Sequence, residues 1–537
     1  MNPPPDTIGA ALRRSASKHP DRIAVVGDGQ RLSFRSLDER ADHLALGLQA
    51  LGIGPGDHVA LLMTNDPEWV LAWMATLRLG AVLVPVNTRY KREEVEYVLR
   101  QSDAKLLITM DRCWDIDYLG LIRALAPELD AVPQGGLLHS ATLPELRTVV
   151  TWRDTRHGGL PNVEGLIVSG RQLAGRQALP QVDPASGAII VYTSGTTGFP
   201  KGAMHSHVML RNVANIARAM HIEPGDAILG HMPFYHVAGA CSGILPTILL
   251  GCTLVTMPQW EPGLALRLIE AERVAIFGGI PTHFIDCLDE MARRPRDTSS
   301  LKSAWIGGAT VTPDVAEAAK RVLQIGALLA VYGMTETTSM TTVSAFDDPI
   351  EITCDNRGKP IGDFEVVVCD AAGGRPLPAG QIGEVWVRGH LVMMGYYKKP
   401  DATADVLSAD GWFRTGDLGS FDERGYLKIT GRLKDMFIVG GSNAYPAEIE
   451  RVLQTHPSIK QAVVVGRPDR RLGEVGFAFV QLEPGAALTA EEIVAYCKPL
   501  MADYKVPRQV RIVGDFPLTS TGKIRRAELA ARAAEAP

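Results

Sequence analysis

Hydrophobic positions in the first hundred residues follow two different periods in turn. Leucine and alanine recur at the spacing of one helix face over residues 37–48, and glycines follow, so a helix that ends near residue 52 is expected. Residues 59–63 form a short apolar run typical of a buried strand, residues 67–80 fit a second helix, and residues 81–86 fit another strand. This order of elements predicts an α/β architecture built on mainly parallel sheets.

The pattern changes twice further along the chain. Residues 112–175 are rich in glycine and proline and show no regular period, which indicates surface elaboration. After a charged cluster at 432–435, a compact block begins that contains three apolar strands and a helix with a capping box. Since about 100 residues are enough for a small independent domain, we predict a large domain over residues 1–431, a hinge at 432–435 and a small domain over 436–537.

Composition agrees with an enzyme of more than one domain. A chain of 537 residues is longer than one hydrophobic core usually serves. Hydrophobic residues make up 46% of the chain and charged residues 21%, which is ordinary for a soluble globular enzyme. The formal net charge of −5 argues against a general nucleic-acid binder, because such a protein carries a basic surface. Any anionic ligand must therefore be met by local cations.

Targeting and redox signals are sparse. No run of 18 apolar residues occurs, so no membrane span is expected, and the first twenty residues lack the apolar centre of a secretory signal. The seven cysteines are scattered, odd in number and form no C-x-x-C pair, so we expect reduced core cysteines rather than disulfides or a zinc site. These features predict a cytoplasmic protein.

One glycine-rich stretch concentrates small hydrogen-bond donors beside a cation. Residues Thr193 to Gly198 hold four hydroxyl side chains and two glycines, and Lys201 follows. An apolar strand over residues 188–192 precedes the stretch and helical spacing begins at Met209, so we expect a loop that joins a strand to a helix, where backbone N–H groups can converge on an anion. The loop is not a Walker A loop, because proline and glycine flank the lysine. It predicts a phosphate site of another kind.

The stretch YTSGTTGFPKG resembles the signature of the adenylate-forming superfamily, which comprises acyl-CoA synthetases, non-ribosomal adenylation domains and beetle luciferases. Four further segments resemble the family in its order: VYGMTETT, GWFRTGDLG, GRLKDMFIVGG and PLTSTGKIRR. Together they span nearly the whole chain. The resemblance implies a large N-terminal domain of mixed, mainly parallel sheets flanked by helices, and a small mobile α+β C-terminal domain.

The same resemblance implies a reaction in two halves. A carboxylate attacks the α-phosphorus of ATP to give an acyl-adenylate and pyrophosphate, and a thiol then attacks the acyl carbon and releases AMP. With CoA as the thiol, the enzyme is an acyl-CoA ligase that uses ATP, Mg²⁺ and CoA. Because the first half brings one anion up to another, it needs positive charge where the transition state gathers negative charge.

Residues that match the family's nucleotide motifs receive roles from the resemblance. Thr193, Ser194, Gly195, Thr196, Thr197, Gly198 and Lys201 are expected to hold the β- and γ-phosphates. Tyr332 and Gly333 belong to the adenine segment, and the small residues Gly307, Gly308 and Ala309 leave room for a flat base or an acyl chain. Thr335 is expected to donate to the α-phosphate or to the acid, and Glu336 to bind Mg²⁺, since a carboxylate beside phosphates requires a cation between them.

The remaining motif residues are in the last quarter of the chain. Asp417 is expected to accept hydrogen bonds from the ribose hydroxyls, and Arg432 to bridge ribose and phosphate. Lys523 matches the family's catalytic lysine. Lys434 takes the family's hinge position, about which the small domain rotates between the two half-reactions. Gly440 and Gly441 are expected to line the tunnel for the thiol arm.

The segment HMPFYHVAGACSGILP, residues 231–246, resembles the family's acyl-pocket segment. His236 is expected near the carboxylate of the acid. No Asp or Glu occurs in this segment, and an unpaired ammonium would be costly to bury, so the acid is expected to lack an α-amine. Small and apolar residues predict a roomy apolar pocket for a fatty, cyclic or aromatic acid.

Two other readings stay open at this point. In the first, the enzyme passes its acyl group to a carrier-protein thiol or stops at the adenylate. In the second, the protein binds nucleotide and has kept the fold without catalysis. The absence of a carrier domain in the sequence and the stretch GGSNAYPAEIE, which resembles CoA ligases, favour the ligase, and Lys523 and Glu336 are both present. The expected partners are a small carboxylic acid, ATP and CoA, without nucleic acid. The oligomeric state stays open, with a homodimer as one alternative.

Overall fold

The computed structural model describes residues 6–113, 116–152, 159–193, 200–308, 311, 313–355, 357–370, 374–439, 442–519 and 523–535. The chain divides into two compact units. The first comprises Met1–Glu365 and Arg388–Phe413, and the second comprises Val366–Val387 and Arg414–Pro537. The chain therefore enters the second unit, returns to the first and leaves it again before its C-terminal part. The hinge expected at residues 432–435 concerns the motion of one domain against another, so it stays a prediction.

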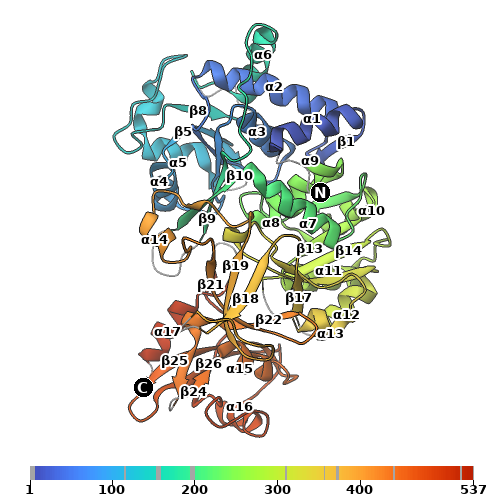
Figure 1. Cartoon of the computed structure of the whole chain (residues 1–537), viewed down its shortest axis with the longest axis vertical. Coiled ribbons are helices and arrows are strands. Elements are labelled where there is room, and N and C mark those ends of the chain that lie inside the picture. Colours follow the sequence, from blue (N-terminus) through green and yellow to red (C-terminus); the bar gives the residue numbers. More distant parts are fainter. Residues whose placement is uncertain are drawn as a thin grey trace. The chain divides into compact units, whose positions relative to one another are not determined.

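One sheet of the first unit is mainly parallel (Figure 1). Its strands are, in order across the sheet, β17 (Arg357–Pro360), β16 (Thr342–Val343), β15 (Ala327–Tyr332), β14 (Ser303–Gly307), β13 (Ile276–Gly279), β11 (Ala227–Gly230), β12 (Thr253–Thr256), β1 (Ile23–Gly27) and β2 (Gln30–Ser33). The strands from β15 to β1 pair in parallel, and the pairs at either end are antiparallel.

A second sheet of the first unit repeats this arrangement. Its strands are, in order, β20 (Gly395–Tyr396), β10 (Lys201–Ser206), β9 (Gly187–Thr193), β4 (Val82–Pro85), β3 (His58–Leu62), β5 (Ala104–Thr109) and β8 (Thr148–Thr151). The strands from β9 to β8 pair in parallel, and β10 is antiparallel to both of its neighbours. A small separate hairpin pairs β6 (Arg112–Cys113) with β7 (Ile116–Asp117).

Helices cover these sheets and separate them. Those of the first unit are α1 (Ile8–Lys18), α2 (Phe34–Ala50), α3 (Pro67–Arg78), α4 (Arg92–Gln101), α5 (Tyr118–Leu125), α6 (Val163–Leu173), α7 (Leu210–Ala219), α8 (Val237–Gly239), α9 (Leu245–Leu250), α10 (Pro262–Ala271), α11 (Pro281–Arg293), α12 (Pro313–Val322), α13 (Ile350–Cys354) and α14 (Pro400–Ala404). Every residue of α3 is buried, because α3 packs against β1 of one sheet and against β3 and β4 of the other. A helix buried all round needs no amphipathic stripe.

The second unit contains two smaller sheets. One has the order β18 (Glu365–Cys369), β19 (Gly383–Arg388), β21 (Phe413–Phe421) and β22 (Leu427–Arg432). The other has the order β24 (Ser442–Ala444), β23 (Phe437–Val439), β26 (Gly473–Leu482) and β25 (Ile459–Asp469), and β27 (Gln509–Ile512) pairs with β26. Its helices are α15 (Pro446–Leu453), α16 (Ala490–Cys497) and α17 (Arg526–Ala534). The predicted strands are present, and the capping box of α16 pairs Thr489 with Glu492.

The interpretation of residues 112–175 as surface elaboration is wrong for much of that stretch. It contributes β8 to the second sheet, and Leu138, Leu143 and Leu146 are buried in the core beside that sheet. Leucines spaced through irregular loops produce no period in the sequence, yet they cover the edge of a sheet once the chain has folded over it.

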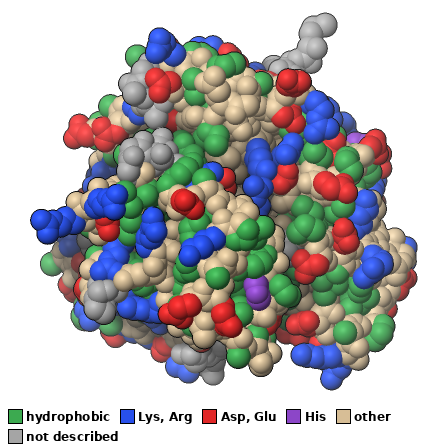
Figure 2. All heavy atoms as spheres, turned by 90° about the horizontal axis from the view of Figure 1, so that it is seen from below, with side chains coloured by type: hydrophobic (Ala, Val, Ile, Leu, Met, Phe, Trp, Pro, Cys, Tyr) green, Lys and Arg blue, Asp and Glu red, His purple; other side chains and the backbone are tan. Residues whose placement is uncertain are grey.

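No helix within the described ranges is long and apolar enough to cross a membrane. On the face drawn in Figure 2, basic and acidic side chains are interspersed. This distribution agrees with the small net charge of the chain and offers no wide basic surface on that face.

Candidate active site

The turn that follows β15 carries the predicted adenine and magnesium residues. Tyr332 ends the strand, and Thr335 and Glu336 begin a short 3₁₀ turn that ends at Thr337. Gly333 has no room for a side chain, because a Cβ there would be 1.7 Å from the carbonyl oxygen of Ser339. The turn therefore folds tightly back on itself and keeps Tyr332, Thr335 and Glu336 in one short segment.

Two buried side chains from neighbouring elements hold this turn in place. His205 of β10 lies 2.8 Å from the carbonyl oxygen of Thr335 through Nε2, which must carry the proton because a carbonyl only accepts. Asn212 of α7 donates to the carbonyl oxygens of Thr338 and Met340, at 2.9 Å each. Burial lowers the pKa of His205 to about 4, so the ring stays neutral near pH 7.

Glu336 and Lys201 meet at one tyrosine. The hydroxyl of Tyr396 donates to Oε1 of Glu336 over 2.8 Å, and the ammonium of Lys201 lies 4.9 Å from the centroid of the same ring. Tyr396 reaches this position because β20 pairs with β10, which places Tyr396 opposite Ala203. Two predicted site residues that are 135 positions apart in the sequence are thereby brought to one spot.

Burial, and after it the charge of Glu336, raises the pKa of Tyr396 above its ordinary value. The phenol therefore remains protonated and keeps donating to the carboxylate. Within the described part of the chain, Glu336 has no ion-pair partner, and the Tyr396 hydroxyl is its side chain's one hydrogen bond. This half-buried carboxylate is an oxygen donor of the kind that a hard divalent cation prefers.

The ends of the glycine-rich loop are paired strands. Thr193 ends β9, Lys201 begins β10, and the two residues are opposite each other in the antiparallel ladder. The expectation that the loop leads directly into a helix is wrong, because β10 lies between the loop and α7. The missed strand reads KGAMHS, which is too short and too mixed in polarity to stand out. Ser194, Gly195, Thr196, Thr197 and Gly198 lie outside the described residues.

Glycines at the end of β14 have structural reasons of their own. A Cβ on Gly307 would be 2.6 Å from the side chain of Val331, and Gly308 has a φ of +78°, which favours glycine. These constraints explain both residues without a ligand, so a role in binding a base or an acyl chain stays a prediction. Ala309 lies outside the described residues.

His236 is at the start of α8, inside the predicted acyl segment. Its Nδ1 accepts a hydrogen bond from the backbone N–H of Ala238 at 3.1 Å. The neutral ring therefore carries its proton on Nε2. A π-helical turn, Ala240–Ile244, joins α8 to α9, and its five residues are buried. Gly239 lets this turn approach the preceding loop, because a Cβ there would be 2.3 Å from the carbonyl oxygen of Pro233.

In the second unit, Asp417 and Arg432 form an ion pair. They are opposite each other on β21 and β22, and Nε of Arg432 lies 3.0 Å from Oδ1 of Asp417. Asp417 is buried, whereas the side chain of Arg432 is 49% exposed. The buried carboxylate of Glu384 supports the same turn, since it accepts from the backbone N–H of Gly416 at 3.2 Å and from the indole of Trp386 at 2.8 Å.

Lys434 and Lys523 also belong to the second unit. Burial, and after it the charge of Arg432, lowers the pKa of Lys434. Lys523 is exposed, and its backbone N–H donates to Oγ1 of Thr519 at 3.0 Å, while the Thr519 N–H donates back to the Lys523 carbonyl. Gly440 and Gly441 lie outside the described residues.

Four supporting residues were not found from the sequence: Tyr396, His205, Asn212 and Glu384. Each acts on a segment that is distant in the sequence, and none belongs to a motif that carries chemistry by its spacing. The one available signal is the stretch GYY at 395–397, a glycine beside two aromatic residues. That signal is weak, because such a pair is also typical of a packed strand end.

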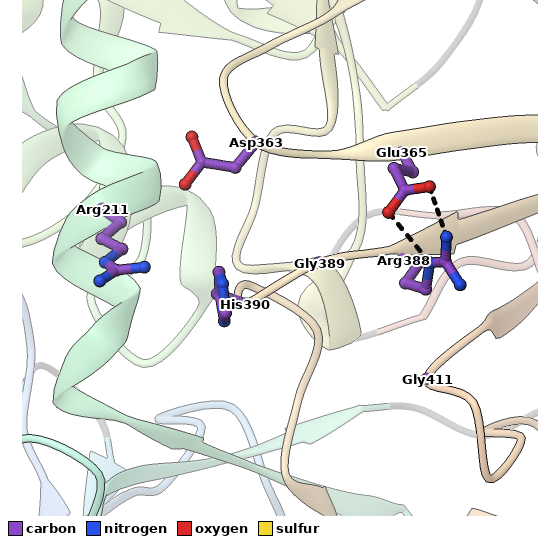
Figure 3. A pocket seen from close by; sticks show the side chains of 7 residues that line it. All are labelled: Arg211, Asp363, Glu365, Arg388, Gly389, His390 and Gly411. Atoms are coloured by element: carbon purple, nitrogen blue, oxygen red, sulfur yellow. Dashed lines mark hydrogen bonds and ion pairs between the residues drawn. The ribbon is translucent and has the colours of Figure 1, made fainter. Parts of the chain in front are cut away.

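A separate polar hollow of about 500 Å³ lies in the first unit and contains none of the predicted site residues (Figure 3). Arg388 and Glu365 pair with each other there through two hydrogen bonds, of 3.0 and 2.6 Å. Arg211 and His390 point toward the open space between α7 and the segment that follows β19. Since its lining mixes both signs of charge, the hollow does not define a ligand.

Sequence comparison identifies the family. Residues 12–397 match the AMP-binding enzyme family, and residues 448–523 match the AMP-binding enzyme C-terminal domain. The chain therefore belongs to the AMP-binding enzyme family, the adenylate-forming class that its loop and turns resemble.

Relatives that are named as CoA ligases match nearly the whole of this chain. The chain is 34% identical over 538 residues to the medium-chain acyl-CoA ligase ACSF2, mitochondrial, of Bos taurus, covering 97% of this chain and 87% of the relative. It is 36% identical over 524 residues to a 3-(7a-methyl-1,5-dioxo-octahydro-1H-inden-4-yl)propanoyl:CoA ligase of Mycobacterium tuberculosis, covering 97% and 98%.

A solved structure agrees with this assignment. The anthranilate CoA ligase AuaEII in complex with anthranoyl-AMP has a TM-score of 0.86 and 25% identity, with 99% of this chain and 98% of that chain covered. The chain is thus an AMP-forming acid–CoA ligase, and the predicted fold class and reaction class are confirmed. ATP and CoA are the substrates of this family, and loading of a carrier protein is not favoured.

Proposed function

We propose that the enzyme activates a fatty, cyclic or aromatic carboxylic acid without an α-amine, and that the residues predicted from the motifs perform the two half-reactions. The observation that carries this proposal is the meeting of Lys201 and Glu336 at Tyr396. A nucleoside triphosphate that binds with a divalent cation requires positive charge for its phosphates and a carboxylate for the metal ion. Lys201, at the end of the glycine-rich loop, and Glu336, beside it, supply these two groups.

In the first half-reaction, an oxygen of the acid's carboxylate attacks the α-phosphorus of ATP. The bond from that phosphorus to the bridging oxygen breaks, and pyrophosphate leaves. The loop from Thr193 to Gly198, with Lys201, holds the β- and γ-phosphates, and Thr335 donates to the α-phosphate or the acid. Lys523 supplies positive charge beside the attacking carboxylate, where the transition state gathers charge.

Glu336 fits a magnesium site. Its Oε1 is oriented by Tyr396, and no described residue donates a hydrogen bond to Oε2. When bound there, Mg²⁺ would neutralise phosphate charge and stabilise the leaving pyrophosphate. The role of the protein is to hold the Glu336 carboxylate in one orientation, and the protonated phenol of Tyr396 supports that orientation.

The nucleoside roles predicted from the motifs fall on residues of each unit. Tyr332 and Gly333, with Gly307, Gly308 and Ala309, provide flat surfaces for adenine. In the second unit, the Asp417 carboxylate accepts from the ribose hydroxyls, and Arg432, which is 3.0 Å from it, is placed to bridge toward phosphate. The half-exposed guanidinium keeps N–H donors for that purpose.

In the second half-reaction, the sulfur of CoA attacks the acyl carbon, the bond from that carbon to the AMP oxygen breaks, and the thiol proton passes to solvent. We propose that the small domain, residues 436–537, rotates about the hinge at 432–435 with Lys434 at its centre. Gly440 and Gly441 then line the thiol tunnel, and His236 lies near the reacting carboxyl carbon. This rotation would move Lys523 away from the reacting atoms and bring the thiol tunnel toward them.

The proposed acid class follows from the charges of the acyl segment and agrees with the relatives. Residues 231–246 contain no carboxylate that could pair an ammonium. The bovine relative is named for medium-chain acyl groups, and the mycobacterial relative for a bicyclic propanoyl group with two oxo groups. Neither acyl group, as named, carries an α-amine.

The test is a panel of acids assayed for AMP release with and without CoA. Octanoate, palmitate, benzoate and a cyclic acid are compared with the common amino acids. We expect CoA-dependent AMP release with at least one acid of the first group. If an amino acid gives faster AMP release than every other acid, the acyl-pocket assignment is wrong. If AMP release does not depend on CoA, the assignment as a CoA ligase is contradicted.

Two further proposals concern the compartment and the oligomeric state of the enzyme. All seven cysteines are free thiols, most of them buried, which suits a reducing compartment such as the cytoplasm. A homodimer is the simplest assembly for such an enzyme. Sedimentation of the purified protein tests the second proposal directly.

A further inference from the structure

Asn65 lies in the turn between β3 and α3, and its side chain is 5% exposed. This side chain reaches a segment of the other sheet of the first unit, residues 230–234, which follow the carboxyl end of β11. The turn with Asn65 likewise follows the carboxyl end of its strand, β3. Ligands of α/β sheets bind outside the carboxyl ends of the strands, so Asn65 joins two segments of the kind that build a site.

Three hydrogen bonds connect the Asn65 amide to residues 230–234. Its Nδ2 donates to the carbonyl oxygens of Gly230 at 3.1 Å and Met232 at 2.8 Å, and its Oδ1 accepts from the backbone N–H of Phe234 at 2.9 Å. Two carbonyls and one N–H require two donors and one acceptor, which an amide supplies in one orientation only. A leucine of similar size would make none of these bonds, and an aspartate would keep the acceptor alone.

The ring of Phe234 is held by the same stretch of chain. It lies edge-on to the indole of Trp69, four residues after Asn65, with 5.5 Å between the ring centroids. Both aromatic side chains are fully buried. The backbone and the side chain of Phe234 are therefore both fixed by the start of α3, which leaves this residue little freedom to shift.

The chain between Phe234 and α8 is too tight to absorb a displacement. The backbone N–H of His236 donates to the carbonyl oxygen of Pro233 at 3.0 Å. A Cβ on Gly239 would be 2.3 Å from that same oxygen and 2.6 Å from the carbonyl oxygen of Met232. Pro233 stands between the two residues that Asn65 binds most closely, and its ring fixes φ. A movement of residues 232–234 would therefore carry His236 with it.

We propose that Asn65 is a positioning residue for the acid: it holds residues 230–234 so that His236 lies beside the carboxylate. This inference rests on the proposed function, since that function places His236 near the acid. Without the amide, two carbonyls and one N–H lose their partner in a buried region, and the segment must shift to pair them again. A misplacement of about 1 Å at a group that orients a reactant can cost about 10²-fold in rate.

The experiment measures pyrophosphate exchange in the full-length enzyme, with the acid that gives the fastest CoA-dependent AMP release. Asn65→Ala should lower kcat/KM for the acid by roughly 10- to 100-fold. The KM for ATP should stay unchanged, because the Asn65 amide holds none of the residues assigned to the nucleotide. Asn65→Asp keeps the size and the acceptor but loses both donors, so it should lose about as much as Asn65→Ala.

A double-mutant cycle tests whether Asn65 acts through His236. In a His236→Ala background, Asn65→Ala should cost less than about threefold, because residues that act through one another are not additive. Additive losses overturn the inference and leave the role of His236 intact. If His236→Ala alone does not change kcat/KM for the acid, the proposed function is wrong about His236, and the inference falls with it.

Ser15→Ala is the matched control for stability. Ser15 is buried, and its hydroxyl donates to the carbonyl oxygen of Ile248 at 2.7 Å, so this variant also breaks a buried hydrogen bond between segments distant in the sequence. It should lower the melting temperature without changing the KM for the acid. If Ser15→Ala and Asn65→Ala raise that KM alike, loss of stability explains both effects and the inference is wrong.

Hydrogen exchange tests the contact in the parent enzyme, even if Asn65→Ala does not fold. The N–H of Phe234 should exchange slowly, and rapid exchange overturns the inference. In folded Asn65→Ala, exchange should become faster within residues 230–239, and unchanged protection there means that other groups hold the segment. If Asn65→Ala is unfolded, Asn65→Ser replaces it in the cycle, since its hydroxyl still donates to one carbonyl.

Discussion

In the first unit, the predicted site residues are held by uncharged groups. The phenol of Tyr396 orients Glu336, and His205 and Asn212 hold the turn around it from buried positions. In the second unit, Asp417 is held by the charge of a half-exposed arginine, and Lys523 is exposed.

This difference agrees with the two kinds of task that we propose for these residues. A carboxylate that must keep one orientation toward a metal gains from neutral, buried hydrogen bonds, which do not weaken with ionic strength. Charges that must reach a nucleotide need to remain accessible to it. In the proposed function, the first unit supplies the fixed geometry, and the second supplies Arg432 and Lys523, whose side chains are partly or fully exposed.

The largest expected effect is that of Lys523→Ala. Removing one preorganised donor of this kind costs about 10²–10³ in rate, so formation of acyl-adenylate from acid and ATP should fall by that factor. Conversion of preformed acyl-adenylate and CoA to acyl-CoA should continue near the normal rate, because the proposed rotation moves the lysine away from the reacting atoms. Single-turnover assays of each half-reaction measure this. Equal loss of both halves in a normally melting variant contradicts a role confined to adenylation.

Glu336→Gln tests the fixed part of the first unit. Glutamine keeps an oxygen that accepts from Tyr396 and loses the charge that a cation needs. Since changes around a metal ligand typically cost 10- to 100-fold in affinity, the magnesium requirement should rise by about that factor. Pyrophosphate exchange measured across a magnesium titration gives the shift, and an unchanged titration removes Glu336 from the metal site.

Tyr396→Phe removes the orienting hydrogen bond and leaves the carboxylate. A hydrogen bond to a charged group contributes about 1.5–3 kcal/mol, and partial access of water should reduce the effect to about tenfold in adenylation. The adjacent Tyr397→Phe is a matched control, because the Tyr397 hydroxyl donates to Asp103 at 2.7 Å instead. If both variants behave alike, the contact with Glu336 has no special role.

The smallest expected effect is on stability in mild acid. Burial lowers the pKa of His205 from 6.5 to about 4, so the unfolded chain binds the proton more readily and stability is lost as the pH falls from about 6.5 toward 4. Between pH 7 and pH 6 this one histidine should cost about 0.7 kcal/mol. Urea unfolding at the two pH values should show His205→Gln losing that much less stability than the parent, and an equal loss contradicts the burial of a neutral ring.

Local patterns determined much of the fold from the sequence. The period of residues 37–48 predicted α2, and short apolar runs predicted β3, β4, β25 and β26, because side-chain periodicity depends only on neighbouring residues. The five motifs also identified the family, since phosphate and metal chemistry requires particular residues at fixed spacings.

Long-range packing decided the rest. The burial of α3 between two sheets, the strand β10 after the glycine-rich loop and the core leucines of residues 112–175 depend on segments that meet only after folding. The same holds for the site, because Tyr396 reaches Glu336 through the pairing of β20 with β10. A sequence lists hydrogen-bonding groups in order along the chain, whereas only the tertiary structure determines which groups lie within 3 Å of each other and which are cut off from water.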